Sequence, residues 1–436
     1  MKKRMNDRRG PRTTRLGMER LEHRLLLTTV QQAGDTVTVD GSAINDQISF
    51  VATETEYQLT VNGVGYTYDS SAVSQFVIDG GQGDNSISLQ GNSAAETARV
   101  FHLHGSLEGT SFTVDYNSFS DVDVEGSAGA DLAYMYDSPA SDNFYAYPQS
   151  GRMIGTGYEN VVSGFEEIRA YATAGGAYDR ADLFDSAGND IFTSSPNSSV
   201  MRDTSSSYSN LVTSFPRVDA HANAAGFDKA YFYDSAGDDV FIGRPELAKM
   251  HGPGCVYLNT ATDFERTYGF ATAGGHDRAD FYDSAGDDIF VGEPTFSYLR
   301  GAAYEYYTFA KHFDLVYVGG TTGNDLALLY GTDGNDYMKS GAAYSYMTGE
   351  NFYNRVTGFG DVRGYGRGGY DQAYFTEISA TDQVFGRYNY MRVDRSGPQA
   401  LSFDFDVVRV YSNGNETATA DVDVLDYVFR QYGNWS

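Results

Sequence analysis

The chain contains a single cysteine, Cys255, among its 436 residues. An intrachain disulfide is therefore impossible, and so is a zinc site built from several cysteines. No stretch approaches the roughly 20 consecutive apolar residues that a membrane-spanning helix requires. We therefore predict no membrane span, and we expect the rigidity of the protein to come from a source other than disulfides.

Basic residues are scarce over most of the sequence. Residues 1–27 hold nine Lys or Arg and three acidic residues, whereas the rest of the chain holds 22 basic and 56 acidic residues, a formal net charge of −34. Such a surface repels nucleic acid, because binding to phosphates requires cations. It attracts divalent cations or basic partners.

Proline is also scarce, with 9 residues, whereas Gly (49), Tyr (35) and Phe (27) are abundant. The aromatic content of 14% argues against a disordered chain, because it provides ample apolar surface to bury. Frequent Gly beside aromatic and β-branched residues favours many short strands joined by tight turns.

The most informative pattern is an internal repeat. Aspartates recur at spacings of 46 to 49 residues. Each of them is followed by a second aspartate exactly eleven residues later, a distance that fits one strand and one turn. The pairs are Asp131 and Asp142, Asp179 and Asp190, Asp228 and Asp239, Asp277 and Asp288, Asp325 and Asp336, and Asp371 and Asp382. A less regular copy of the repeat begins at Asp84. A fixed period of this size indicates a solenoid, a propeller or an array.

Each unit has the same predicted plan. Ala occupies the second position after the first Asp in all six units, and a larger apolar residue occupies the fourth, so both lie on one face of a strand. A turn such as SAGDD follows, then a second short strand and about 30 Tyr-rich residues with two-residue periodicity. We therefore expect an all-β unit of about four or five strands.

Two architectures fit such a unit. In a β-solenoid similar to a right-handed parallel β-helix, equivalent residues stack about 4.8 Å apart. In a six- or seven-bladed β-propeller, each unit forms one blade. The recurrent Ala favours the solenoid, because a narrow core repeated in register accepts the same small residue at every level. We predict capping strands at 31–83, a repeat domain at 84–415 and a C-terminal cap at 416–436, where four apolar residues have helical spacing: Val424, Leu425, Val428 and Phe429.

The recurrent aspartates are candidate metal ligands. In a stacked solenoid, Asp179, Asp228 and Asp277 are expected to form one column, where two carboxylates ~5 Å apart repel by roughly 3 kcal/mol at an effective dielectric near 20. The basic residues that follow them, such as Arg180 and Arg278, are expected to offset part of this repulsion. Ca²⁺ binds six to eight oxygens from carboxylates and turn carbonyls. We therefore predict Ca²⁺ at the twelve paired aspartates, with four further candidate ligands: Asp137, Asp185, Asp234 and Asp283.

The alternative is that these side chains accept hydrogen bonds from turn amides and bind no metal. Two turns bear on this choice, GTDGND at 331–336 and GGQGDN at 80–85. They resemble the Gly-Gly-x-Gly-x-Asp turn of RTX calcium-binding β-rolls, although the aspartates of that family are nine residues apart instead of eleven. The resemblance implies calcium at these turns.

The N-terminal segment resembles a surface-protein motif. Within residues 20–27, RLEHRLLL, most positions match the LEPR-XLL motif of large surface and secreted proteins of planctomycete bacteria, and His23 replaces its proline. The unit with AYATAGG and DSAGDDIF also looks like a tandem repeat common in such proteins. The resemblance implies that residues 1–30 direct export, and that the protein is extracellular or on the cell surface.

The pattern argues against catalysis. A β-helix enzyme acting on polysaccharide requires a carboxylate cluster at one level, whereas here carboxylates recur in every unit. His102 and His104 have no evident third metal ligand, and a Cys255–His251 nucleophile has no orienting partner in the sequence. We predict a non-catalytic structural or adhesive protein, with an enzyme acting on extracellular polysaccharide, or a propeller binding a ligand at its axis, as the alternatives.

A surface for partners is predicted in the Tyr-rich segments. Aromatic faces bind sugars and proteins well. The candidate residues for contact with a polysaccharide or a protein are Tyr304, Tyr306, Tyr307, Tyr344 and Tyr346.

Overall fold

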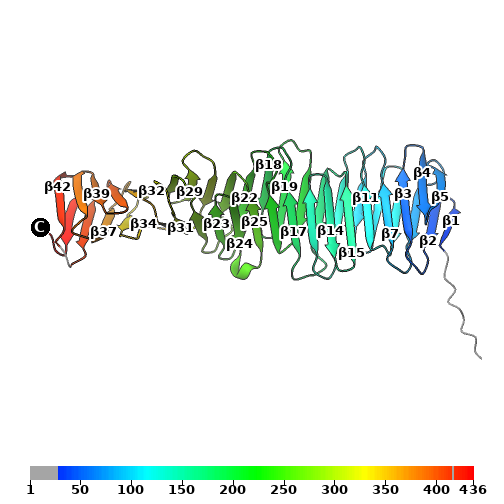
Figure 1. Ribbon diagram of the computed structural model, residues 1–436, viewed down its shortest axis with the longest axis horizontal. Helices are drawn as coiled ribbons and strands as arrows, with labels where there is room; N and C mark the ends of the chain where they lie inside the picture. The colour runs from blue at the N-terminus through cyan, green and yellow to red at the C-terminus, as the bar shows by residue number, and fades with distance from the viewer. Residues whose placement is uncertain (1–27, 415–416) are drawn as a thin grey trace, which may run out of the picture.

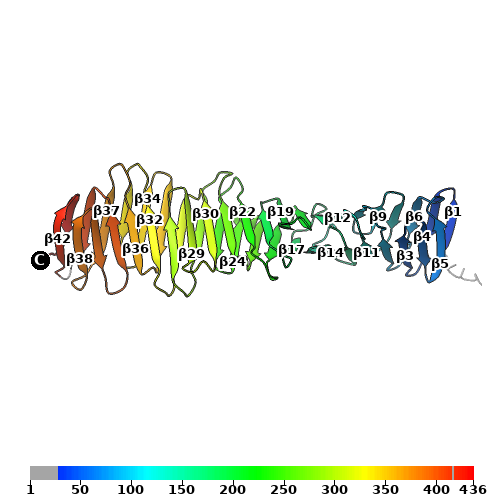
Figure 2. The same cartoon turned by 90° about the horizontal axis from the view of Figure 1, so that it is seen from above.

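A computed structural model describes residues 28–414 and 417–436, and the motif at residues 20–27 lies outside these ranges. The chain forms an elongated β-solenoid with β1 at one end and β42 near the other (Figures 1 and 2). This confirms the predicted all-β solenoid, and no propeller is formed. In the described part of the chain the one helical segment is the 3₁₀ turn η1 (Pro253–Cys255), and no helix there has the length and apolar character needed to cross a membrane.

The strands form two sheets whose pairings each run in one linear order along the rod. Sheet A contains, in order of pairing, β1 (Thr29–Ala33), β2 (Thr36–Asp40), β6 (Gln75–Asp79), β10 (Thr113–Asn117), β9 (His104–Glu108), β8 (Thr97–Val100), β12 (Leu132–Tyr136), β16 (Glu167–Tyr171), β20 (Ser209–Thr213), β19 (Ser198–Asp203), β18 (Asp190–Ser194), β22 (Lys229–Tyr233), β26 (Arg266–Phe270), β30 (Tyr307–Lys311), β29 (Phe296–Gly301), β28 (Asp288–Gly292), β32 (Leu326–Tyr330), β36 (Asp361–Tyr365), β40 (Gln399–Phe403), β39 (Tyr390–Asp394), β38 (Gln383–Tyr388) and β42 (Thr419–Leu425).

Sheet B contains, in the same sense, β5 (Val64–Asp69), β4 (Glu56–Val61), β3 (Gln47–Ala52), β7 (Ser86–Gln90), β11 (Asp121–Glu125), β15 (Tyr158–Ser163), β14 (Ser150–Gly155), β13 (Asn143–Tyr147), β17 (Arg180–Phe184), β21 (Arg217–His221), β25 (Leu258–Thr262), β24 (Leu247–His251), β23 (Val240–Arg244), β27 (Arg278–Tyr282), β31 (Leu315–Gly319), β35 (Phe352–Thr357), β34 (Tyr344–Gly349), β33 (Tyr337–Ser340), β37 (Gln372–Ile378), β41 (Val407–Ser412) and β43 (Val428–Tyr432). With strands about 4.8 Å apart, the rod is about 100 Å long.

Each repeat unit contributes five strands. The unit that starts at Asp131 places β12 in sheet A, an antiparallel meander of β13, β14 and β15 in sheet B, and β16 in sheet A again. The next unit, from Asp179, starts with β17 in sheet B and places its meander in sheet A. Each unit thus visits the two sheets three times, with a single strand, a three-stranded meander and a second single strand. Because this number is odd, successive units start on opposite sheets. The same order of strands is present in β2–β6, within residues 36–79.

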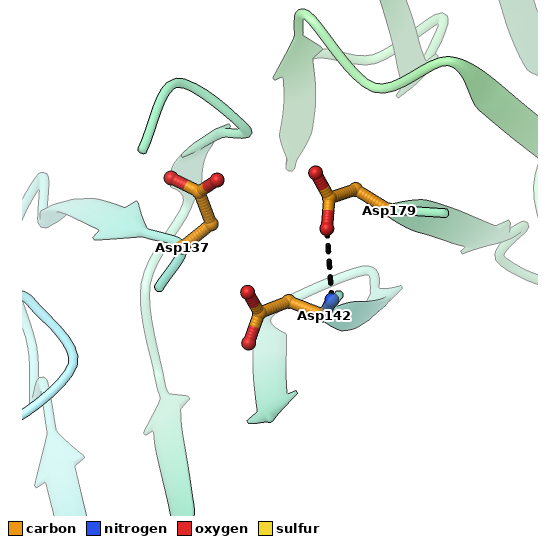
Figure 3. A group of neighbouring side chains, drawn as sticks. All are labelled: Asp137, Asp142 and Asp179. Atoms are coloured by element: carbon orange, nitrogen blue, oxygen red, sulfur yellow. Dashed lines mark hydrogen bonds between the residues drawn. The ribbon is translucent and has the colours of Figure 1, made fainter. Parts of the chain in front are cut away.

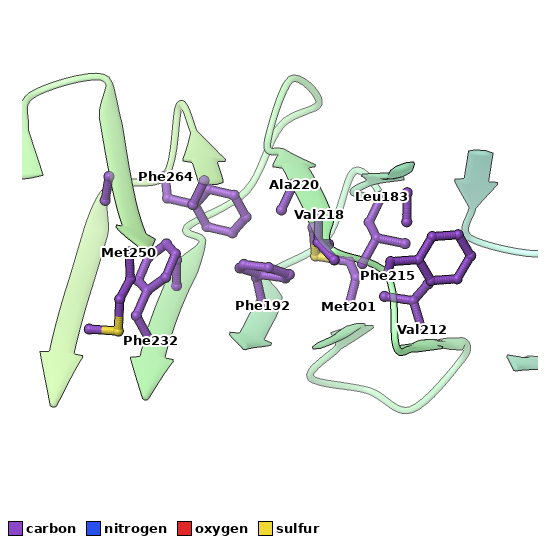
Figure 4. Close-up of a cluster of buried hydrophobic side chains, with 14 of the residues drawn as sticks. Leu183, Phe192, Met201, Val212, Phe215, Val218, Ala220, Phe232, Met250 and Phe264 are labelled. Atoms are coloured by element: carbon purple, nitrogen blue, oxygen red, sulfur yellow. The ribbon is translucent and has the colours of Figure 1, made fainter. Parts of the chain in front are cut away.

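The core lies between the two sheets, where inward side chains from both form a continuous apolar row (Figure 4). The predicted inward Ala and the larger residue two positions later are buried in all six units. However, the recurrent Ala residues of successive units do not stack on one another, although Ala133 does pair with Ala98 on β8. Ala133 pairs with Ile168, and Met135 pairs with Ala170 on the neighbouring strand. At these positions a small side chain lies beside a large one on the next strand, which helps to fill the narrow space between the sheets.

The C-terminal segment forms strands instead of the helix that its spacing indicated. Val424 and Leu425 end β42, and Val428 begins β43, which pairs in parallel with β41. An exposed sheet edge offers a full row of backbone partners to this segment, so edge pairing outweighs a short helical pattern.

Candidate metal centres

The paired aspartates lie in the turns at the two edges of the solenoid, where the chain passes between sheets. Because the units alternate, Asp179 and Asp277 lie before strands of sheet B, whereas Asp228 lies before a strand of sheet A. The predicted single column of first aspartates is therefore wrong.

Each edge instead joins the second aspartate of one unit to the first aspartate of the next. The backbone N–H of the second aspartate of one unit donates to the carboxylate of the first aspartate of the next unit at 2.7–2.9 Å. The pairs are Asp142 with Asp179, Asp190 with Asp228, Asp239 with Asp277, Asp288 with Asp325, and Asp336 with Asp371. Two predicted residues stand outside this scheme. Asp131 accepts from the N–H of Glu96 at 2.7 Å, and the N–H of Asp382 donates within its own turn, to the carbonyl oxygen of Ser379.

A third carboxylate joins these pairs in the central units. In the described residues there are three groups in which one carboxylate oxygen from each of three aspartates lies within 4.8 Å of the other two, and every member is buried. They are Asp137, Asp142 and Asp179; Asp234, Asp239 and Asp277; and Asp283, Asp288 and Asp325. Figure 3 shows the first group, with three carboxylates from two levels of the rod facing a common space. The additional predicted ligands Asp137, Asp234 and Asp283 are thus placed beside the paired aspartates.

Turn amides and hydroxyls hold these carboxylates in place. Asp142 accepts hydrogen bonds from the N–H and the hydroxyl of Ser138, four residues earlier, and the same contacts recur in later units. Asp137 accepts from the N–H groups of Thr173 and Ala174 on the next level. The aspartates therefore cap their own turns and also tie adjacent levels together.

A buried tyrosine completes each central cluster, and sequence reasoning did not assign it there. The phenol of Tyr306 donates to Asp288 at 2.5 Å, although Tyr306 was expected on the surface. The equivalent bonds join Tyr158 to Asp142, Tyr208 to Asp190 and Tyr257 to Asp239. The signal was available, because a Tyr follows the first Asp by 27 or 29 residues in these four units. Burial and the neighbouring carboxylate raise the pKa of these phenols, so they remain donors.

No basic side chain compensates these clusters. In the part of the chain that the structure describes, no Lys, Arg or His nitrogen lies within 4.0 Å of a three-carboxylate group. Arg180 and Arg278, expected to offset the charge, instead pair with Asp182 and Asp280 on the outer sheet face. The reason is strand alternation, which turns the residue after the first Asp outward.

The electrostatic consequence is a set of unusually weak acids. Burial raises the pKa of five first aspartates to about 6, and repulsion by neighbouring carboxylates adds to the effect, while a backbone N–H opposes it. These residues are Asp179, Asp228, Asp277, Asp325 and Asp371.

Of the other predicted candidates, the two histidines His102 and His104 each pack against an aromatic ring, whereas Cys255 and His251 contact each other. His102 packs edge-on against Tyr158, and His104 stacks on Phe101. The sulfur of Cys255 lies 4.0 Å from Nδ1 of His251, which also contacts the carbonyl oxygen of Gly252.

The remaining predicted tyrosines lie on the outer faces of the sheets. On sheet B, Tyr346 stacks with both Tyr344 and Tyr353. On sheet A, Tyr307 packs against Tyr268. Tyr304 is exposed, and Arg300 covers its ring. These side chains form aromatic rows along the rod.

Fold and site together describe an elongated repeat protein with buried carboxylate clusters at its edges. No known protein family matches the chain, and no curated protein shows significant similarity to it.

Proposed function

We propose that this protein is an exported, non-catalytic structural rod of the cell surface, stiffened by Ca²⁺ at its edge clusters. The observation that carries the proposal is the recurrence of three buried carboxylates with no basic partner. A catalytic site is needed once, whereas a stiffening site is useful at every level.

Calcium suits these clusters better than other common cations. Three carboxylates offer up to six oxygens, and Ca²⁺ accepts irregular sets of oxygen ligands, whereas Mg²⁺ requires near-octahedral geometry and retains its water. The donors already present position the carboxylates without neutralising their charge.

The clusters suit a stabilising role because their members come from distant positions. Asp137 and Asp179 belong to successive units and meet only in the folded solenoid. A cation that binds only the folded state stabilises it by about 2.7 kcal/mol per site at a free concentration of 100 times Kd. Several sites along the rod would add to one another.

Export and adhesion rest on sequence features. The LEPR-XLL resemblance, the acidic composition and the absence of cysteine pairs support a surface protein whose rigidity comes from metal. The outer aromatic rows offer a surface for polysaccharide or protein, and the charge disfavours nucleic acid.

The test is thermal unfolding of the full chain by circular dichroism in Ca²⁺, in Mg²⁺ and in EDTA. We expect Ca²⁺ to raise the Tm by several degrees over EDTA and Mg²⁺ to have little effect. A variant with Asp137→Asn, Asp234→Asn and Asp283→Asn keeps the paired aspartates and should lose the calcium response. An equal Tm in Ca²⁺ and EDTA would contradict the metal role and leave the aspartates as turn caps. Fractionation of the source cells tests export separately.

A further inference from the structure

A second type of site lies near the C-terminal end, where a recurrent packing contact changes. In four units a buried Asn donates its side-chain amide to a backbone carbonyl 59 to 64 residues earlier, at the tip of a meander hairpin. These residues are Asn160, Asn210, Asn259 and Asn354. The contact closes the space between hairpins on successive levels.

In the last unit this position is Ala400 in β40, because Ala400 pairs with Val362 in the same register in which Asn354 pairs with Val316. Ala400 has no side-chain donor, so the amide contact to the neighbouring hairpin is lost, and Ala400 lines the space that remains. Arg395, from the β39–β40 turn, takes over the contact, and its Nη2 donates to the carbonyl oxygens of Ser340 and Thr376 at 3.3 Å each.

The replacement leaves a cavity and an uncompensated charge. The cavity has a volume of about 330 Å³ and lies between the β33–β34 turn, the β35–β36 turn and the β39–β40 turn. Arg395 lines it, and its Nε and Nη1 are buried without hydrogen-bond partners. No carboxylate in the described residues lies within 4.0 Å of this guanidinium, although Glu377 and Asp382 act on it from further away. Burial accordingly lowers the pKa of Arg395.

A buried guanidinium with two unsatisfied nitrogens and no anionic partner is costly, and an anion in the cavity would remove that cost. The surroundings specify the kind of anion. Val356, Phe359 and Val362 supply buried apolar wall, and only one cation is present. The carboxylate of Glu377, bonded to the N–H of Ala342 at 2.8 Å, adds negative charge nearby and disfavours a dianion such as phosphate or sulfate.

We propose that this cavity binds the carboxylate of a sugar acid, with Arg395 as the carboxylate-binding residue. The volume suits a ligand of roughly one sugar ring, because the apolar wall accepts the ring while the guanidinium holds the acid. The site goes beyond the proposed structural role and does not depend on calcium, so either can fail alone.

The experiment is isothermal titration calorimetry of the full chain, in EDTA, with glucuronate, glucose, acetate and sulfate. We expect glucuronate to bind and the other three to bind at least tenfold more weakly, since each lacks the ring, the acid or the single charge. A polymer ending in the same acid distinguishes a chain end from a free sugar acid.

Two variants and a control assign the binding. Arg395→Gln should weaken glucuronate binding at least tenfold. Gly397→Phe leaves Arg395 in place and adds a side chain at the cavity wall, where a Cβ would meet no atom within 4 Å, and it should weaken binding too. Arg392→Gln, in the preceding strand β39 and paired with Asp394 at 2.8 Å, should leave binding unchanged. The proposal would be overturned if glucuronate does not bind, or if acetate or sulfate binds equally well. It would also be overturned if Arg395→Gln leaves glucuronate binding unchanged.

Discussion

The edge clusters occur in two forms along the rod. In four central clusters the turn contributes a third Asp, six positions after the first, and a Tyr hydroxyl donates to the second Asp. In two other clusters, Gly91 and Gly331 replace that third Asp, and Phe112 and Phe352 replace the Tyr. The carboxylate that loses the Tyr hydroxyl, Glu96 or Asp336, then has a buried oxygen without a partner.

This difference shows that the third carboxylate and the phenol belong together. A third buried negative charge raises the cost of ionising the cluster, and a neutral donor lowers it. Where the third carboxylate is absent, the donor is absent too. The three compact groups of three carboxylates are therefore the expected cation sites, and we expect the two reduced clusters to act as turn caps only.

The largest expected effect is on the pH dependence of stability. The first aspartates have a pKa of about 6 in the folded chain, against roughly 3.9 when unfolded, so the folded state binds more protons between about pH 4 and about pH 6. Stability in EDTA should therefore rise on acidification from about pH 7.5 to about pH 5. With Ca²⁺ the direction should reverse, because protons compete with the metal.

The measurement is the Tm across this pH range, with and without Ca²⁺. A Tm that falls on acidification in EDTA would contradict the raised pKa values.

The next effect separates a central carboxylate from an exposed one. Asp239→Ala leaves the buried donors of Ser235 and Tyr257 without a partner, so we expect a loss of about 3 kcal/mol of unfolding free energy. Urea denaturation in EDTA provides the value. Asp115→Ala, on the exposed face of β10, is the control and should change stability by less than about 0.5 kcal/mol. Similar losses for the two variants would show that the cluster hydrogen bonds contribute nothing.

A reciprocal exchange tests the two cluster types directly. Tyr306→Phe removes the donor to Asp288 and should cost about 1–2 kcal/mol, whereas Phe352→Tyr supplies a donor to Asp336 and should gain about 1 kcal/mol. Urea midpoints of the single variants show the signs. Tyr304→Phe, at an exposed ring, should be neutral. A destabilised Phe352→Tyr variant would mean that the reduced cluster has no room for the hydroxyl.

The smallest effect concerns aspartates that do have basic partners. Asp421 on β42 contacts Arg387 at 2.8 Å, and both side chains are partly exposed to solvent. Asp421→Asn should therefore cost no more than about 1 kcal/mol, and the cost should shrink in high salt. Chemical denaturation at two salt concentrations checks both points. A cost equal to that of Asp239→Ala would remove the distinction between edge and face.

Much of the architecture could be predicted from the sequence, because strand periodicity and turn residues are local signals. The inward Ala and the eleven-residue spacing of the aspartates each follow from one five-residue strand plus one turn. Asp84 was placed one residue early, since Asn85 accepts the N–H of Asp46 at the equivalent position.

The rest depends on how units meet, which a single unit does not encode. Whether Asp228 lies beside Asp179 depends on the odd number of strands per unit, and a prediction of four or five strands left this open. The role of Tyr306 depends on which meander strand faces the edge. Arg395 lies beside Ala400, where other units have an Asn, and its contacts depend on packing between levels.

The most direct test of the cation account is a count of bound Ca²⁺ by equilibrium dialysis of the full chain. We predict at least three ions per chain at millimolar free Ca²⁺, one for each compact group of three carboxylates, and the Asp137→Asn, Asp234→Asn, Asp283→Asn variant should lose those three. Retention of no Ca²⁺ by the wild-type chain, or the same number by both proteins, would contradict the claim that these clusters are cation sites.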